Sequence, residues 1–395
     1  MSRAIISLNA GSSSIKFGLF LLTPDGPVHA AGGKLEGIGA DPRLVVRGED
    51  GSELAQRGWP DGAVLTHEAL LDDLYHWADG HLPHHQIVAV GHRVVHGGTH
   101  FAAPVRIDAA TLKALEALSP LAPLHQPHNL AAIRAIAAMA PDLPQIACFD
   151  TAFHHDMPPV AARMALPCAY ADRGYRRYGF HGLSYEYIAD RLRAVDPALA
   201  AGRVIVAHLG NGASMCAMRA LRSVDTTMGF TALDGLMMGT RTGSLDPGVV
   251  VHLMEQERLG GEAIEDLLYR QSGLLGVSGV SSDMRALHAS DDPHAADAIE
   301  LFVWRAARHA GALMVGLEGL DGIVFTAGIG ENDPIIRRMI CARLAWTGIR
   351  IDDAANEANA PVISAADSVI TVRVIPTDEE RMIARHTARL LGEAA

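Results

Sequence analysis

The sequence predicts an α/β protein in which mixed sheets are flanked by helices, arranged as two duplicated domains. Three observations support this prediction. The chain has 395 residues, more than one ordinary core accommodates. Short apolar strands alternate with helical patterns. One strand–bend–strand sequence also occurs twice, as AIISLNAGSSSIKFGLF from residue 4 and as RVIVAHLGNGASMCAMR from residue 203. We place the boundary between the domains near residue 150.

Composition and charge exclude several classes of function. The net charge of −12 argues against a nucleic-acid-binding protein, which needs a basic face. No apolar run is long enough for a membrane span or a signal peptide, so we expect no membrane partner and a cytoplasmic location. The cysteines are far apart and favour a reducing compartment over disulfides or zinc: Cys148, Cys168, Cys216 and Cys341.

In the first domain, residues 4–22 are predicted to form a hairpin, because two apolar runs flank a bend of small residues. A second hairpin should turn at residues 49–51, which read Glu-Asp-Gly. Helical spacing then covers residues 65–78, followed by an apolar strand at 86–92. A further helix at 129–140 leads to a strand at 145–150.

The second domain repeats this order. A helix is expected after His181, with Ser184 as its N-cap, and residues 203–219 form the second glycine-bent hairpin. Apolar residues at helical spacing from 299 to 317 indicate a long helix with one buried face. An apolar strand at 322–326 is predicted to end in a third glycine-bearing turn. The loop 229–248 contains five glycines and two methionines, and long loops of this kind tend to carry function.

The bends themselves indicate phosphate binding. Small residues allow backbone N–H groups to approach an anion closely, and Lys16 adds a positive charge after the first bend. One such bend alone is better explained as a tight hairpin. Three bends after apolar strands, directed into one cleft, favour a polyphosphate pocket. The P-loop, dinucleotide and protein-kinase signatures are all missing.

Charged residues and histidines follow several strands. Arg93 and Asp150 each lie at the carboxyl end of an apolar strand, where α/β proteins bind ligands. His181 precedes a helix, and His125 lies in a stiff, proline-containing segment. Arg241, in the glycine-rich loop, is the strongest single candidate, because arginine binds a carboxylate or phosphate through two parallel hydrogen bonds.

Seven motifs together resemble the acetate kinase family, a branch of the actin, sugar-kinase and heat-shock ATPase superfold. They occur in family order: LNAGSSSIKF, GHRVVHGG, FDTAFH, YGFHGLSYEY, HLGNGAS, GLMMGTRTG and FTAGIGEN. The resemblance implies two actin-like, ribonuclease H-like domains with an interdomain cleft. Residues 1–150, joined by the C-terminal helix 380–395, would form one domain, and residues 151–379 a nucleotide-binding domain.

The resemblance also implies a reaction: direct in-line phosphoryl transfer from ATP to acetate, giving ADP and acetyl phosphate, with Mg²⁺ or alternatively Mn²⁺. It implies a homodimer. Asn9 and Glu379 match metal-site residues. Arg93 and Arg241 match the arginines that hold the carboxylate and the phosphoryl group. The other catalytic positions are Asp150, His181 and His125. Because the nucleophile is already a carboxylate, we expect Asp150 to organise the metal or the arginines rather than to remove a proton.

Further residues match the binding segments of the family. The acyl pocket positions are Val95, Leu124, Phe180 and Ala232. The nucleotide-contacting positions are Ser12, Ser14, Lys16, His208, Leu209, Gly210, Asn211, Gly212, Asp283, Met284, Arg285, Gly328, Ile329, Gly330, Glu331 and Asn332.

Ala232 departs from the family, which usually has proline there. A smaller residue would admit an extra methylene, so the sequence leaves a propionate or butyrate kinase open as an alternative. Outside catalysis, the alternative is an ATP-gated binding protein or a filament subunit of the same superfold. Neither of these needs an arginine clamp for a carboxylate.

Overall fold

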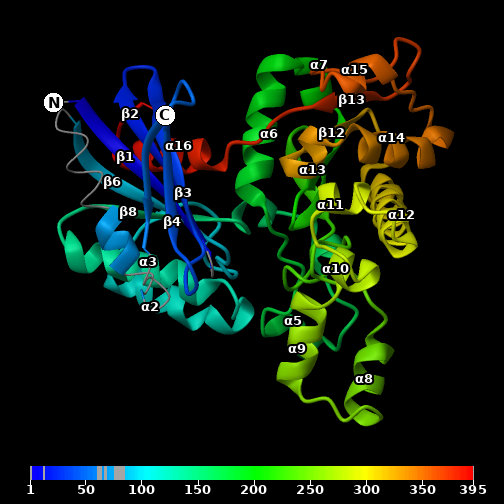
Figure 1. Cartoon of the computed structure of the whole chain (residues 1–395), viewed down its shortest axis with the longest axis horizontal. Helices are drawn as coiled ribbons and strands as arrows, with labels where there is room; N and C mark the ends of the chain where they lie inside the picture. The colour runs from blue at the N-terminus through cyan, green and yellow to red at the C-terminus, as the bar shows by residue number, and fades with distance from the viewer. Residues whose placement is uncertain (1, 12–13, 60–64, 66–68, 75–84, 395) are drawn as a thin grey trace. The chain divides into compact units, whose positions relative to one another are not determined.

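The computed structural model describes residues 2–11, 14–59, 65, 69–74 and 85–394. It divides into two compact units (Figure 1). Unit 1 consists of Met1–Ala152 together with Asp378–Ala395, and unit 2 consists of Phe153–Thr377. Unit 1 is therefore assembled from both ends of this sequence. The assignment of unit 2 as the nucleotide-binding domain stays a prediction.

In its described residues, unit 1 contains an eight-stranded sheet in the order β5-β4-β3-β2-β1-β6-β8-β7. The first five strands form an antiparallel meander: β1 (Ser2–Ala10), β2 (Ser14–Thr23), β3 (Gly26–Glu36), β4 (Arg43–Gly48) and β5 (Glu53–Gly58). Two strands run parallel to β1: β6 (His85–Val94) and β8 (Gln145–Phe149). The short β7 (Val105–Arg106) pairs antiparallel with β8. Both predicted hairpins are confirmed, and so are the predicted strands at 86–92 and 145–150, which the structure shows to be parallel.

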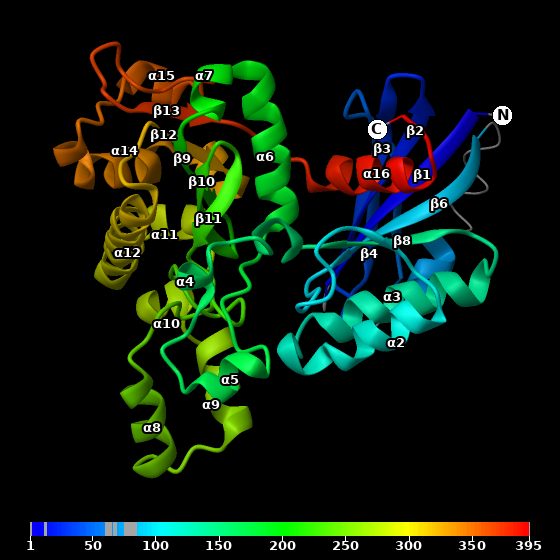
Figure 2. The ribbon, with the colours of Figure 1, turned by 180° about the vertical axis from the view of Figure 1, so that it is seen from behind.

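Helices cover both faces of this sheet, as Figure 2 shows for α3 and α16. Alternate residues of β1 divide between the faces. Ile6 and its neighbours on that face pack against α3 (Gln126–Met139) and the helical residues 69–74. Ile5 packs on the opposite face against α16 (Glu379–Leu390). Gly91 allows α16 to approach β6, since a Cβ there would lie 2.5 Å from Ile383 Cγ2. The remaining helical elements of this unit are α2 (Ala109–Ala117) and η2 (Ser119–Leu121).

Unit 2 contains, in its described residues, a five-stranded sheet in the order β11-β10-β9-β12-β13. Its strands are β9 (Arg203–Leu209), β10 (Ala213–Arg219), β11 (Arg222–Thr226), β12 (Gly322–Thr326) and β13 (Thr371–Val374). The first three are antiparallel, and β12 and β13 are parallel to β9. The strands β3-β2-β1-β6-β8 of unit 1 have the same order and directions. This shared topology confirms the predicted duplication.

Two helices cover the sheet of unit 2. The helix α6 (Gly182–Val195) packs through Tyr185 and Ile188 on one face. The long α12 (Pro293–Leu317) covers the other face (Figures 1 and 2). The short η3 (Ala152–His154) begins at the last residue of the first segment of unit 1. The other helical elements of unit 2 are α4 (Pro159–Ala162), α5 (Cys168–Asp172), α7 (Pro197–Ala200), α8 (Pro247–Glu255), α9 (Gly261–Arg270), α10 (Gly273–Ser278), α11 (Met284–His288), α13 (Ala327–Asn332), α14 (Pro334–Arg343), η4 (Ala345–Thr347) and α15 (Asp353–Glu357).

The structure differs from the sequence-based expectations at α13 and at the start of α6, and it contains strands for which we had no expectation, such as β3. The third glycine-bearing segment forms the helix α13 and not a turn. Residues 26–36, whose three glycines and proline obscure a strand pattern, form β3. Ser184 is not the N-cap of α6, because the helix begins at Gly182 and His181 takes the cap position. Of the predicted helix 65–78, residues 69–74 are described and helical. No helix in the described part of the chain combines the length and apolarity that a membrane span requires.

Candidate active site

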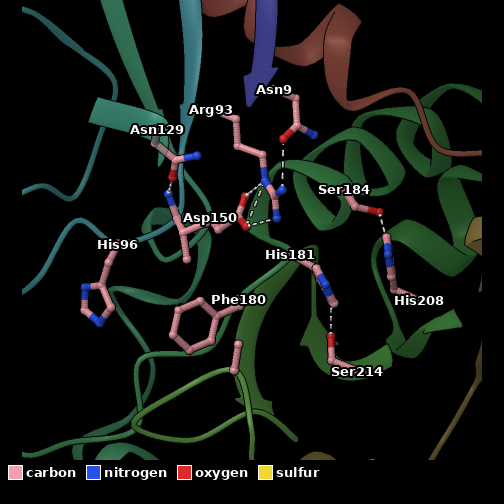
Figure 3. A network of polar contacts seen from close by, with 12 residues as sticks. Asn9, Arg93, His96, Asn129, Asp150, Phe180, His181, Ser184, His208 and Ser214 are labelled. Carbon is pink, nitrogen blue, oxygen red and sulfur yellow. Dashed lines mark hydrogen bonds and ion pairs between the residues drawn. The ribbon is translucent and has the colours of Figure 1, made fainter. Parts of the chain in front are cut away.

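The carboxyl ends of three neighbouring strands in unit 1 bring together an amide, a guanidinium and a carboxylate. Asn9 lies near the end of β1, Arg93 near the end of β6, and Asp150 directly after β8. Arg93 Nε donates to Asp150 Oδ1 at 3.0 Å and to Oδ2 at 3.1 Å, and Nη2 donates to Oδ2 as well. Arg93 Nη1 donates to Asn9 Oδ1 at 3.1 Å (Figure 3). The parallel order β1-β6-β8 therefore places three predicted residues in one cluster.

Acidic neighbours stabilise the charge of Arg93. Burial alone would lower the pKa of this guanidinium, but the attraction of Asp150 and Glu379 outweighs burial and raises the pKa above its ordinary value. Asp150 is only 1% exposed. A buried pair of this kind contributes little net stability, but removal of one partner leaves an uncompensated charge. The three hydrogen bonds between the two side chains give the guanidinium a defined orientation.

Glu379, the first residue of α16, adds a second carboxylate near Arg93. Although the residue is partly accessible, its carboxyl group is surrounded by protein, and this burial raises its pKa to about 7. Arg93 opposes the rise, and the negative charge of Asp150 adds to it. The folded protein thus holds two carboxylates close together with one guanidinium to neutralise them.

Oxygen ligands for a divalent cation are present in this cluster. The described residues contain no group of three or more His, Cys, Asp and Glu side chains that forms a complete metal cage. Mg²⁺ does not need such a cage, since it keeps several waters and binds through one or two carboxylates together with substrate phosphates. Asn9, Glu379 and Asp150 supply an amide oxygen and two carboxylates. Burial and the charge of Asp150 raise the pKa of Glu379, and a nearby positive charge would stabilise its ionised form. The residues present fit Mg²⁺.

The other predicted residues of unit 1 lie around these strand ends. Lys16 pairs with Asn9 in the β1–β2 register, and Ser14 begins β2; Ser12 lies outside the described residues. Val95 is 3% exposed, and its N–H donates to Asn129 Oδ1 at 3.0 Å. The half-buried Leu124 and His125 precede α3, with His125 at its N-cap.

In unit 2, His181 is held in an unusual conformation beside a second histidine. Its backbone is left-handed, with φ 59° and ψ 26°, which a residue other than glycine adopts only when its surroundings enforce it. Its Nδ1 lies 2.9 Å from Ser214 Oγ, and its ring stacks on that of His208 at 4.2 Å. His208 Nδ1 lies 2.9 Å from Ser184 Oγ (Figure 3). Phe180, directly before His181, is 2% exposed.

The bend between β9 and β10 lies next to His181. His208 and the buried Leu209 end β9, and the bend itself is formed by Gly210, Asn211 and Gly212. A Cβ on Gly212 would lie 3.3 Å from Nε2 of His181. The imidazole edge therefore faces this bend, where we predicted a phosphate group.

The glycine-rich loop 229–248 contains Arg241. One of its guanidinium nitrogens, Nη1, donates to the carbonyl oxygen of Ala232 at 2.9 Å, so the residue that departs from the family also anchors the predicted clamp. Ala232 is half-buried. Met237 and Met238 are buried and form the core of the loop, and Met238 N–H donates to the Arg241 carbonyl at 3.1 Å.

Two short helices hold several of the predicted nucleotide-contacting residues. Asp283 caps α11, and its carboxylate pairs with Arg285, whose hydrogen bonds lower the pKa of Asp283 to about 2. Met284 is 3% exposed. In α13, Glu331 Oε1 accepts from Ala327 N at 2.7 Å and from Thr377 N at 3.0 Å. The other predicted residues of α13 are Gly328, Ile329, Gly330 and Asn332.

Arg337, which we did not identify from the sequence, supports α13 from within the protein. It is fully buried on α14. Its Nη1 donates to the carbonyls of Gly330 and Glu331, at 3.0 and 2.9 Å. Its other nitrogens donate to Asn356, at 2.8 Å to Oδ1 and 2.7 Å to the carbonyl, and to Asn359 Oδ1 at 2.6 Å. The sequence shows only one of several arginines on a helix and does not signal this role.

Replacing Arg337 by Lys should destabilise unit 2 by about 3 kcal/mol, because three ammonium donors cannot satisfy five buried acceptors. We also expect weaker nucleotide binding, since two of the acceptors lie in α13. Urea unfolding and a nucleotide titration measure these effects. Arg338→Lys is the matched control: Arg338 is the adjacent, 40% exposed residue that pairs with Asp353 and Glu357. Equal effects of the two variants would contradict the assigned role of Arg337.

Comparisons with known proteins show which family this chain resembles. Residues 4–385 match the model of the acetokinase family. The chain is 54% identical to the acetate kinase of Rhodopseudomonas palustris (strain ATCC BAA-98 / CGA009), covering 99% of both chains. It is 51% identical to the acetate kinase of Methylocella silvestris, covering both chains completely. Among solved structures, it resembles a propionate kinase from Francisella tularensis with a TM-score of 0.90 and 38% identity, covering 98% of this chain and 99% of that one. For the acetate kinase of Porphyromonas gingivalis the TM-score is 0.87 and the identity 36%, covering 99% and 100%.

Proposed function

Because this chain belongs to the acetokinase family, we propose that it is an acetate kinase, which transfers the γ-phosphoryl group of ATP reversibly to acetate. An acetate oxygen attacks the γ-phosphorus, the bond from that phosphorus to the β,γ-bridging oxygen breaks, and ADP leaves with the electron pair. Acetyl phosphate is the second product. No proton has to be removed from the nucleophile, since acetate is already ionised at neutral pH.

The observation that carries this proposal is the orientation of Arg93. Asp150 occupies one side of the guanidinium through Nε and Nη2, and Asn9 accepts from Nη1. A guanidinium held in this way is preorganised to bind an anion, and preorganised charge is the main source of catalysis in phosphoryl transfer. We assign Asp150 the role of holding Arg93 rather than that of a general base.

Mg²⁺ would be held by Asn9 and Glu379, with Asp150 beside them. When bound, it would neutralise charge on the phosphate groups and on Glu379. In unit 2, we assign the Gly210–Gly212 bend to phosphate binding, His181 and Arg241 to the phosphoryl group, and α11 and α13 to the adenosine. Val95, Leu124, Phe180 and Ala232 are assigned to the acyl group.

The test is acyl-phosphate synthesis, measured by trapping the product with hydroxylamine. We expect synthesis that depends on ATP, acetate and Mg²⁺, and a loss of about 100-fold or more in Arg93→Ala and Arg241→Ala. Arg106→Ala on the edge strand β7 is the control, and circular dichroism checks the fold. The proposal fails if either folded site variant retains near wild-type turnover. ATP hydrolysis that is independent of any acid would favour the ATP-gated binding protein.

Ala232 supports a second candidate substrate, propionate. The family usually has proline at this position, and one methylene in an apolar pocket changes selectivity by about 1–3 kcal/mol. We expect Ala232→Pro to lower kcat/KM for propionate relative to acetate by about tenfold or more. The measurement is the ratio of the two specificity constants in both proteins. If the protein strongly prefers acetate and Ala232→Pro leaves this preference unchanged, propionate and butyrate are both excluded as preferred substrates.

We also propose a cytoplasmic homodimer. The family resemblance implies the dimer, and α8 supports it: no residue of this helix is buried, and Val249, Val251 and Met254 are 40%, 50% and 52% exposed. The cysteines all lie in the described part of the chain and form no disulfide, which fits a reducing compartment. Sedimentation should show a dimer that Val251→Glu with Met254→Glu dissociates, whereas Val160→Glu on α4 does not. A wild-type monomer at micromolar concentration would contradict the proposal.

A further inference from the structure

The imidazole of His181 is hydrogen-bonded to a chain of two buried hydroxyl groups. Its Nδ1 lies 2.9 Å from Ser214 Oγ, and Ser214 Oγ forms a second hydrogen bond with the hydroxyl of Tyr185. Ser214 and Tyr185 are both 0% exposed. Ser214 lies on β10 and Tyr185 on the first turns of α6, so two elements of unit 2 hold this arrangement. Figure 3 shows the contact between His181 and Ser214.

We propose that Ser214 and Tyr185 are positioning residues that hold His181 as a neutral imidazole with its hydrogen on Nε2. This inference rests on the proposed function, because it gives His181 a defined task towards the phosphoryl group. The chain of hydrogen bonds runs from the Tyr185 hydroxyl to Ser214 Oγ, and from the Ser214 hydroxyl to Nδ1 of His181. In this order each hydroxyl hydrogen has an acceptor, and the more acidic phenol is the first donor.

A second histidine–serine pair in unit 2, His154 and Ser223, shows which ring nitrogen carries the hydrogen in such a contact. His154 Nε2 lies 3.0 Å from the carbonyl oxygen of Phe180, and Nδ1 lies 2.8 Å from Ser223 Oγ. A carbonyl only accepts, so Nε2 must carry the hydrogen. Burial lowers the pKa of His154 to about 4, so the ring is neutral and Nδ1 accepts from Ser223. The His154–Ser223 pair therefore has the tautomer that we propose for His181.

The stacked partner of His181 has a relay of its own. Thr377 Oγ1 donates to Ser184 Oγ at 2.9 Å, and Ser184 Oγ lies 2.9 Å from Nδ1 of His208. Because Ser184 Oγ accepts a hydrogen bond from Thr377, the hydroxyl hydrogen of Ser184 can be donated to Nδ1 of His208. The two rings are 4.2 Å apart and nearly parallel, so two positive charges on them would repel each other. In the proposed arrangement, each ring accepts a hydroxyl hydrogen at Nδ1.

The proposed tautomer directs the Nε2–H group of His181 at the bend between β9 and β10, where we predict a phosphate group. Nε2 of His181 faces Gly212 so closely that a Cβ on this glycine would lie only 3.3 Å away. A neutral imidazole there donates a hydrogen bond to a phosphoryl oxygen and transfers no proton. This use of a neutral histidine suits a reaction in which charge spreads over oxygens and no proton moves.

Nitrogen NMR of the full chain labelled with ¹⁵N-histidine tests the proposal directly. The His181 signals are identified by their loss in His181→Gln. We expect a pyridine-type signal for Nδ1 and a pyrrole-type signal for Nε2. In Ser214→Ala the two signals should move towards each other as both tautomers become populated, and Tyr185→Phe should move them less. Ser223→Ala is the matched control, which should move the His154 signals and leave those of His181 in place.

Kinetics provide the second readout. Ser214→Ala should lower kcat by about tenfold, with KM for ATP and acetate changed less than twofold, and Ser214→Thr should restore most of kcat. A pyrrole-type Nδ1 in the wild type, or Ser214→Ala signals identical to wild type, would overturn the proposal. The expected NMR signals in a protein that makes no acyl phosphate would overturn the proposed function and leave the tautomer assignment standing.

Discussion

Asp150→Asn is expected to lower acyl-phosphate synthesis by about 100- to 1000-fold and to destabilise unit 1 by roughly 3 kcal/mol. The carboxylate is 1% exposed and accepts three hydrogen bonds from Arg93. An amide has one oxygen in place of two and carries no charge. The variant therefore leaves the charge of Arg93 without its ion-pair partner and the guanidinium without its orientation.

The division of this loss between kcat and KM identifies the role of Asp150. If Asp150 holds Arg93, KM for acetate should rise together with the fall in kcat, because the anion loses its preorganised partner. A fall in kcat at constant KM and constant stability would indicate a general base and contradict our assignment. Steady-state kinetics and urea unfolding supply both measurements. Asp142→Asn, at an exposed position in the same unit, should change neither.

Glu379→Gln is expected to abolish most of the activity and at the same time to stabilise the metal-free protein. Burial raises the pKa of Glu379 from 4.5 to about 7, so the folded state binds this proton more tightly than the unfolded state. The stability contributed by the proton is present at low pH and is lost as the pH rises from 4.5 through about 7. At pH 8 the ionised group destabilises the metal-free protein by roughly 3 kcal/mol, and glutamine removes this penalty.

Thermal unfolding in the presence of a chelator measures this effect. At pH 8 the variant should melt several degrees above the wild type, and the difference should shrink towards pH 5. Addition of Mg²⁺ should raise the melting temperature of the wild type and leave the variant nearly unchanged, because the cation provides the missing neutralisation. Glu53→Gln, at an exposed position on β5, serves as the control. A variant that is less stable than the wild type at pH 8 would contradict this account.

Local patterns were sufficient to predict the residues that lie along the strands. Arg93 and Asp150 each follow an apolar run, and the rule that ligands bind at the carboxyl ends of strands grouped these two correctly. Asn9, which lies beside Arg93 in unit 1, was assigned from the family resemblance. The duplication was also visible in the sequence, since the two hairpins have the same pattern of apolar and small residues. Both features depend on neighbours in the chain, which a single sequence shows directly.

Features that depend on distant contacts could not be predicted. Ser214 and His181 come into contact only when β10 packs beside α6. Thr377 and Ser184 are 193 residues apart in the sequence, and only the fold brings their hydroxyl groups together. Arg337 was overlooked because nothing in its local sequence shows that the helix buries it. We expected Ser184 to cap a helix, but the left-handed backbone at His181 shifts the helix start, and Ser184 instead contacts His208.

The position of α16 has a consequence for biosynthesis. The helix covers one face of a sheet whose strands are all made before unit 2, and it also carries Glu379. While unit 2 is being synthesised, that face, with Ile5 and Phe20, has no helix to cover it and is a ready target for chaperones. A ribosome-bound chain at that stage also lacks a carboxylate that we assign to metal binding. The same short helix therefore both covers this apolar face and brings Glu379 to unit 1.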